Sequence, residues 1–212
     1  MTPVICLVTD RHTSGGVEGV VAHVARAARA GVQLIHIRER DLEARTLTAL
    51  VARCLEAVRG TRTRVVVNDR LDVALAAGAH GVHLRAESMP GVRVRAVTPP
   101  GFLIGRSVHA REEAARVEAA GGLDYLVFGT VFASASKPGR APAGPPALAE
   151  VVQAVRVPVL AIGGVTPDNL HEVAATGAAG FAAITLFTAP SDRTVAQVMA
   201  RAAEAWAALR KD

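Results

Sequence analysis

Eight short, strongly apolar segments follow one another along this chain, and stretches with helical periodicity separate them. The eight segments are Val4 to Val8, Leu34 to Ile37, Val65 to Val67, Gly81 to Leu84, Leu103 to Ile104, Tyr125 to Phe128, Val157 to Ile162 and Phe181 to Ile184. The clearest helical patterns are Val17 to Ala30, Leu42 to Val58, Arg111 to Ala120 and Leu148 to Val155. This alternation is typical of an α/β fold, in which helices cover a buried parallel sheet.

A weak internal repeat indicates how the strands are grouped. Gly31, Gly78, Gly121 and Gly177 each end a helical pattern and lead into a strand, where a left-handed residue commonly closes a helix. Successive glycines are about two strand–helix units apart, so four double units make eight strands. No G-x-G-x-x-G motif follows the first strand, which argues against an open dinucleotide-binding sheet. We therefore predict a single (β/α)8 TIM barrel as one domain over residues 1–212.

Composition limits the classes of function. Hydrophobic residues make up 50% of the chain and aromatic residues only 3%, so we expect a core of Ala, Val, Leu and Ile. The net charge of +5 comes from Arg spread along the chain, without clustered Lys and aromatic residues, and we predict no nucleic-acid partner. No apolar run approaches the length of about 20 residues that spans a bilayer. We expect no membrane partner and a soluble, cytoplasmic protein, in which Cys6 and Cys54 are free thiols. The sequence is compatible with a homodimer.

In a barrel, the functional residues lie where strands end and the following loops begin. Gly163 and Gly164 follow the seventh predicted strand, and Ile184 and Thr185 close the eighth. Exposed backbone N–H groups at these two neighbouring ends are the usual phosphate site of such barrels, and glycine lets an anion approach closely. The alternative is a tight Gly-Gly turn without a ligand.

The loop after the sixth strand, residues 130–146, carries the only lysine outside the last two residues of the chain. Lys137 lies beside the hydroxyls of Ser134 and Ser136, and this combination suits the oxygens of a phosphate. An exposed lysine in a linker is the alternative.

The second strand sends His36, Arg38 and Arg40 to one side, because side chains alternate along a strand. Two arginines at its carboxyl end would face a phosphorylated ligand. The alternative is that these arginines form salt bridges with Glu39 or Asp41.

Further polar residues end the third, fourth and fifth strands. Asn68 and Asp69 follow the third strand, and Asp69 could hold Mg²⁺ or substrate, or cap the next helix. His83, Ser107 and His109 come from the fourth and fifth strands. A single histidine in a strand is more often packed than catalytic.

Read together, these strand ends resemble the family of thiamine-phosphate synthase and the TenI-type thiazole tautomerase over nearly the whole chain. The motifs are Leu7 to Asp10, Gly31 to Asp41, Val67 to Arg70, Gly81 to Leu84, Gly105 to His109, Phe128 to Pro138 and Ala161 to Val165. The resemblance implies a small phosphorylated thiazole substrate and a role in thiamine biosynthesis. The synthase joins hydroxymethylpyrimidine diphosphate to thiazole phosphate with loss of pyrophosphate.

The resemblance also implies roles for individual residues. Arg38 and Arg40 match cationic positions that contact the diphosphate, and Asn68 and Asp69 match a pair that helps to hold Mg²⁺. The remaining matches are Ser134, Ser136 and Lys137 with a pyrophosphate clamp, and Gly164, Ile184 and Thr185 with the backbone cradle of the thiazole phosphate.

Two departures from the synthase favour the tautomerase, which needs no metal. Ser88 stands where the synthase has a second Mg²⁺ carboxylate, and His36 stands where it has Gln. The tautomerase histidine associated with proton transfer, however, aligns with Thr130. We therefore interpret the chain first as a tautomerase, with His36 as proton carrier and Arg38 and Lys137 holding the substrate. The alternatives are a Mg²⁺-dependent synthase and a non-catalytic, regulatory thiazole-phosphate binder.

Overall fold

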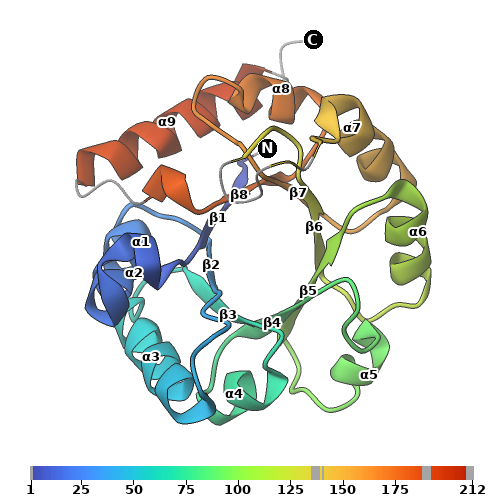
Figure 1. Cartoon of the computed structure of the whole chain (residues 1–212). Helices are drawn as coiled ribbons and strands as arrows, with labels where there is room; N and C mark the ends of the chain where they lie inside the picture. Colours follow the sequence, from blue (N-terminus) through green and yellow to red (C-terminus); the bar gives the residue numbers. More distant parts are fainter. Residues whose placement is uncertain (1, 135–138, 140, 188–191, 209–212) are drawn as a thin grey trace.

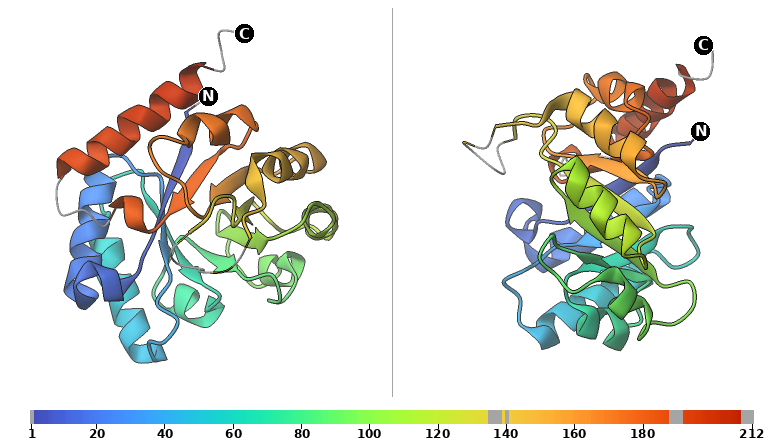
Figure 2. Two further views of the ribbon diagram at one scale, coloured as in Figure 1. Left: turned by 45° about the horizontal axis from the view of Figure 1, so that its top comes forward. Right: turned by 90° about the vertical axis from the view of Figure 1, so that its right-hand side faces the viewer.

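The computed structural model describes residues 2–134, 139, 141–187 and 192–208. All neighbouring strands pair in parallel in the order β1 to β8, and β8 pairs with β1, so the sheet closes on itself. Figure 1 looks down this barrel and shows the helices outside it as a ring. Figure 2 shows the same arrangement from two further sides. The predicted (β/α)8 TIM barrel is confirmed.

The strands are β1 (Val4–Val8), β2 (Leu34–Ile37), β3 (Arg64–Asn68), β4 (Gly81–Leu84), β5 (Leu103–Val108), β6 (Tyr125–Gly129), β7 (Val159–Ile162) and β8 (Gly180–Ala183). The helices are α1 (Arg11–Ser14), α2 (Gly16–Arg29), α3 (Ala44–Ala57), α4 (Leu71–Ala76), α5 (Gly91–Arg95), α6 (Arg111–Ala119), α7 (Gly144–Ala154), α8 (Leu170–Ala175) and α9 (Asp192–Ala208). A 3-10 helix, η1 (Thr185–Phe187), follows β8.

Alternate residues of each strand face the two sides of the barrel wall. In β2, Ile35 and Ile37 pack into the large cluster between strands and helices, whereas Leu34 belongs to the cluster inside the barrel. The other buried members of the inner cluster are Cys6, Val8, Val66, Tyr125, Val127, Leu160 and Ala182. Because the side-chain period of a strand is two, His36 shares the inner face with Leu34. The polar residues at the carboxyl ends of the strands therefore lie above this inner, largely apolar cluster.

Glycine is needed at two kinds of position in this barrel. Gly31, Gly78, Gly121 and Gly177 have φ angles of 87°, 70°, 77° and 80°, so the predicted left-handed closure of the helices is confirmed at all four repeats. Inside the barrel, a Cβ on Gly105 would lie 2.0 Å from Cζ of Tyr125. The absence of a side chain at Gly105 therefore makes room for the tyrosine ring.

Five strands differ from their predicted limits, and in β3 and β6 the observed strand is longer by one residue at an end or at both ends. β5 runs to Val108 instead of ending at Ile104, which places Ser107 within the strand. β7 begins at Val159 instead of Val157, because Pro158 has no N–H to donate to a sheet ladder. β8 ends at Ala183, so Ile184 falls outside it.

The last helix completes the ring. α9 packs against α8 and α2, and Trp206 donates from Nε1 to the carbonyl of Ala178 at 2.9 Å. Cys6 and Cys54 are both buried free thiols. Among the described residues, no helix combines the length and the apolar character that crossing a membrane requires.

Candidate functional site

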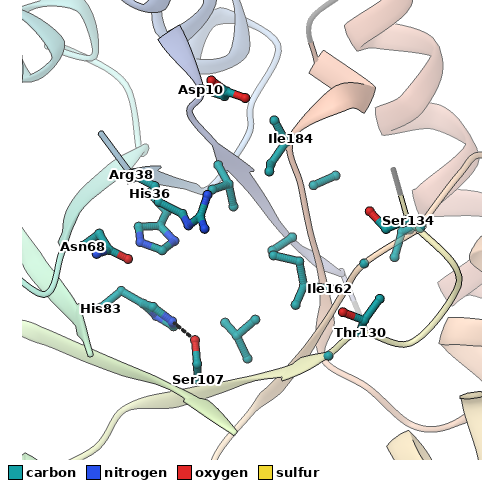
Figure 3. Close-up of a pocket in the computed structure, with 18 of the residues that line it drawn as sticks. Asp10, His36, Arg38, Asn68, His83, Ser107, Thr130, Ser134, Ile162 and Ile184 are labelled. Carbon is teal, nitrogen blue, oxygen red and sulfur yellow. Dashed lines mark hydrogen bonds between the residues drawn. The ribbon is translucent and has the colours of Figure 1, made fainter. Parts of the chain in front are cut away.

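One cavity of about 740 Å³ opens at the carboxyl ends of the strands, where ligand sites of (β/α)8 barrels lie. Figure 3 shows side chains from opposite sides of the barrel that point into it. The predicted site residues that line it are His36, Arg38, Arg40, Asn68, Ser107, Ser134, Gly163, Gly164, Ile184 and Thr185. Asp69 lines a smaller neighbouring pocket of about 190 Å³. Ser136 and Lys137 lie outside the described residues.

Arg38 and Arg40 face the cavity, and a different arginine neutralises the acidic residues beside them. Arg11 pairs with Asp41 and lies 3.5 Å, from Nη1 to Oε2, from Glu39. Neither Arg38 nor Arg40 forms an ion pair with a described acidic side chain. The alternative explanation of the second strand, in which its arginines bind Glu39 or Asp41, is therefore wrong.

Buried hydrogen bonds hold the end of β2 in place. Glu39 is buried and accepts from the hydroxyl of Thr9 at 2.6 Å and from the backbone N–H of Arg11 at 3.1 Å. The Thr9 hydroxyl in turn accepts from the backbone N–H of Arg38 at 3.0 Å. Thr9 and Glu39 thus fix the backbone that carries the two cavity arginines.

Two histidines lie together at the floor of the cavity. The ring centroids of His36 and His83 are 4.5 Å apart, and both residues are buried. Both ring nitrogens of His83 are engaged, Nε2 with the Ser107 hydroxyl at 2.9 Å and Nδ1 with the Tyr125 hydroxyl at 3.2 Å (Figure 3 shows the first contact). Nε2 of His36 is buried and has no hydrogen-bond partner among the described residues.

Burial keeps both rings neutral. Desolvation, followed by the nearby His83 and Arg38, holds the pKa of His36 well below its usual value. Desolvation also lowers the pKa of His83 to about 3. At neutral pH each imidazole is uncharged and presents one donor and one acceptor nitrogen. His36 is therefore suited to hydrogen-bond an uncharged ring, whereas its predicted proton transfer stays a prediction.

The two glycines after β7 lie against the loop that follows β6. A Cβ on Gly163 would lie 2.5 Å from Cγ2 of Thr130, and one on Gly164 would lie 2.3 Å from the carbonyl oxygen of Ala133. Both glycines also have positive φ, 99° and 63°. Close packing of the two loops is thus sufficient to explain Gly163 and Gly164. The approach of an anion to these glycines stays a prediction. A Gly164→Val change would displace the Phe132–Ala133 backbone and would not test anion binding alone.

Asp69 turns away from the cavity toward the loop after β4. Its φ of 59° is left-handed, a conformation that Asp tolerates better than most residues. Its Oδ2 accepts from Nε of Arg85 at 2.7 Å, and its Oδ1 accepts from the Ser88 hydroxyl. The suggestion that Asp69 caps the next helix is wrong, because α4 has Arg70 at its N-cap and no side-chain cap bond.

Arg106 has a clear structural role that was not predicted from the sequence. Arg106 is buried, and its guanidinium donates to the carbonyls of Met89 at 2.9 Å and Ser88 at 2.8 Å, and also to that of Ala86. This side chain ties the loop after β4 to β5. Its place just after the fifth predicted strand, Leu103 to Ile104, is the only signal in the sequence.

The residues around Asp69 do not fit the Mg²⁺ that the resemblance to the synthase implies. Each oxygen of the Asp69 carboxylate already accepts a hydrogen bond, and Ser88 supplies a hydroxyl where a second carboxylate would be needed. Within the described part of the chain, no group of three or more His, Cys, Asp or Glu could hold a metal ion.

The fold and the site together define a class of protein: a (β/α)8 barrel with a ligand cavity, rich in arginine on one side, at the carboxyl ends of its strands. The sequence pattern described as thiamine monophosphate synthase matches residues 5–187, and the chain belongs to this family.

Individual proteins support this assignment. The chain is 42% identical over 171 residues to the thiamine-phosphate synthase of Methanoculleus marisnigri, covering 80% of this chain and 81% of that protein. It is 36% identical over 188 residues to the thiamine-phosphate synthase of Chlorobium luteolum, covering 88% and 86%. The solved structure of the Pyrococcus furiosus thiamine phosphate pyrophosphorylase is 31% identical, with a TM-score of 0.84 over 96% of this chain and 97% of that one. The predicted family resemblance is confirmed, and the chain is an enzyme of thiamine biosynthesis.

Proposed function

We propose that this protein is a thiamine-phosphate synthase, which couples hydroxymethylpyrimidine diphosphate to thiazole phosphate and releases pyrophosphate. The relatives favour this activity over the tautomerase that the sequence alone suggested first, since those named above are synthases or a pyrophosphorylase. The proposal extends their activity to this chain on the basis of its cavity.

The observation that carries the proposal is that two different groups suited to anions line opposite sides of one cavity. Arg38, Arg40 and Arg85 line it from the side of β2 to β4. Gly163, Gly164 and Thr185 line it from the side of β7 and β8, across the barrel. The cationic end suits the more highly charged diphosphate, and the backbone end suits a single phosphate. The coupling reaction needs both anions bound at once.

The reaction requires little acid–base chemistry from the protein. The ring nitrogen of the thiazole uses its lone pair to form a bond to the methylene carbon of the pyrimidine, while the carbon–oxygen bond to the diphosphate breaks. The bonding electrons leave with pyrophosphate, so no oxidant or reductant is needed. Positive side chains at the diphosphate end stabilise the negative charge that develops on the leaving group.

The floor of the cavity fits an uncharged heterocycle. The neutral His36 ring offers a donor and an acceptor, as does the glutamine that the synthase has at this position. Its Nε2 is buried without a hydrogen-bond partner among the described residues. His36 in place of Gln is therefore compatible with the synthase.

Incubation of the purified protein with both substrates tests the proposal, with the product identified by mass spectrometry. We expect thiamine phosphate and pyrophosphate in equal amounts. In the variant Arg38→Gln we expect a loss of roughly 10- to 100-fold in kcat/KM, the size expected for one charge-assisted contact. Arg53→Gln is the matched control, because Arg53 pairs with Glu18 on outer helices and should leave turnover unchanged.

The tautomerase remains the second candidate because Ser88 replaces a carboxylate that the synthase has. It predicts a different result in the same assay: no coupled product, but aromatisation of a thiazole carboxylate phosphate. That outcome would contradict the proposed synthase activity.

A further inference from the structure

The side chain of Arg85 lies between Asp69 and the main cavity. Its Nε donates to Oδ2 of Asp69 at 2.7 Å, and Arg85 lines both the main cavity and the neighbouring pocket that contains Asp69. The side chain is 53% exposed, whereas that of Asp69 is 24% exposed. The pair thus leaves part of the guanidinium open at the mouth of the cavity.

The turn that carries Arg85 is held by several hydrogen bonds. The backbone N–H of Arg85 donates to the Ser88 hydroxyl at 3.0 Å, and the N–H of Ser88 donates to the Arg85 carbonyl at 3.2 Å. The Ser88 hydroxyl itself donates to Asp69. Arg106 donates hydrogen bonds to the carbonyls of Met89 and Ser88. Arg85 is therefore presented from a fixed turn, and Asp69 orients its guanidinium.

Charges that line this side of the cavity are predominantly positive. Arg38, Arg40 and Arg85 contribute three cations, while Glu87 and Asp10 contribute two carboxylates. Asp69 accepts hydrogen bonds from Arg85 and Ser88 and lies outside the cavity lining. The arrangement places three cations where the diphosphate would bind, and no complete set of metal ligands there among the described residues.

We infer that the Arg85 guanidinium supplies the positive charge that a divalent cation would supply to the diphosphate. This enzyme would then bind and release pyrophosphate without Mg²⁺. A guanidinium gives two parallel N–H donors to phosphate oxygens and carries a permanent positive charge. Asp69 acts as the positioning residue for Arg85, and Ser88 completes that link where a second metal carboxylate would otherwise stand. The inference rests on the proposed synthase activity for its catalytic consequence, but not for the anion site.

Binding of inorganic pyrophosphate in excess EDTA, measured by calorimetry, tests the anion site directly. We expect binding by the unmodified protein and affinity lower by about 10- to 100-fold in Arg85→Gln, since a charge-assisted contact is lost. Arg53→Gln should bind as the unmodified protein does. A melting temperature for each variant shows that it is folded, which the exposure of Arg85 favours. Equal affinity of Arg85→Gln and the unmodified protein would overturn the assignment.

The catalytic consequence is tested by measuring coupling with EDTA and with added Mg²⁺. The unmodified enzyme should retain its kcat/KM in EDTA to within about threefold. The double variant Arg85→Gln/Ser88→Asp restores a carboxylate pair with Asp69 and should depend on Mg²⁺. Loss of all turnover in EDTA by the unmodified enzyme, with recovery in Mg²⁺, would overturn metal-independent release and leave the synthase proposal intact. Arg85-dependent pyrophosphate binding without coupling under any condition would support the anion site and refute the synthase.

Discussion

His36 separates the two chemistries considered for the cavity. His36→Gln keeps one donor and one acceptor, so we predict that coupling activity stays within about threefold. His36→Leu removes both groups and should raise KM by about tenfold with a smaller change in kcat. Steady-state kinetics of both variants provides the measurement. If His36 instead carried a proton in the rate-limiting step, His36→Gln would lower kcat by about 10² to 10⁴-fold.

Individual site residues were predictable where a strand period determines their direction. Alternation along residues 36–40 predicted that His36, Arg38 and Arg40 share a side, and all three line the cavity although β2 ends at Ile37. The partners of Asp69 were not predictable, because Arg85 and Ser88 reach it from a loop after a different strand. Such contacts depend on the register of neighbouring strands and on side-chain rotamers, neither of which a single sequence reveals.

At the scale of elements, the loop after β4 depends on one buried side chain. Arg106→Met keeps most of the apolar stem but leaves the carbonyls of Ser88 and Met89 without their donor. We predict that the free energy of unfolding falls by about 2 to 3 kcal/mol, since these bonds involve a charged group in a buried place. Urea denaturation measures the loss. Arg116→Met, at an exposed position of α6, should stay within about 0.5 kcal/mol; equal effects of the two changes would exclude the proposed support of the loop.

The positions of the strands and helices could be predicted from the apolar segments and from the glycines that close the helices. The limits of β5 were harder to predict, because Gly105, Arg106 and Ser107 interrupt its apolar run. Gly105 accommodates Tyr125 and Ser107 contacts His83, so the same residues that hide the strand pattern build the floor of the cavity. Residues that build the cavity floor therefore interrupt the apolar pattern by which a strand is recognised in the sequence.

At the scale of the whole molecule, the buried histidines couple stability to pH. The folded-state pKa of His83 is about 3, below the ordinary value of 6.5, and that of His36 is also lowered. The unfolded chain therefore binds more protons below pH 6.5, so stability is present above that pH and is lost as the pH falls toward 3. Between pH 7 and pH 5 we predict a loss of about 2 kcal/mol from His83, and a further loss in the same direction from His36.

Urea denaturation at the two pH values measures this loss, and His36→Gln provides the control. Replacing His36 should make the pH-dependent loss smaller, because only His83 then remains to be protonated on unfolding. A free energy of unfolding that does not change between pH 7 and pH 5 would show that these rings are protonated as readily in the folded protein as in the unfolded chain.

The barrel itself could be predicted because its constraint is global. Eight apolar segments with helices between them leave few topologies, since parallel connections are right-handed and short, and closure of β8 on β1 completes the order. The choice between coupling and isomerisation could not be predicted in the same way, because both reactions fit one barrel. The comparison with relatives favours coupling, as do the arginines and the glycine turn that line opposite sides of one cavity.

The most direct test of this assignment compares two values of kcat/KM on one preparation of the protein. The first is for formation of thiamine phosphate from hydroxymethylpyrimidine diphosphate and thiazole phosphate, and the second is for aromatisation of thiazole carboxylate phosphate. We predict that the first exceeds the second by at least roughly 100-fold, as expected for a site that must bind both anions for turnover. A ratio reversed by the same factor would contradict the synthase and identify the protein as a tautomerase.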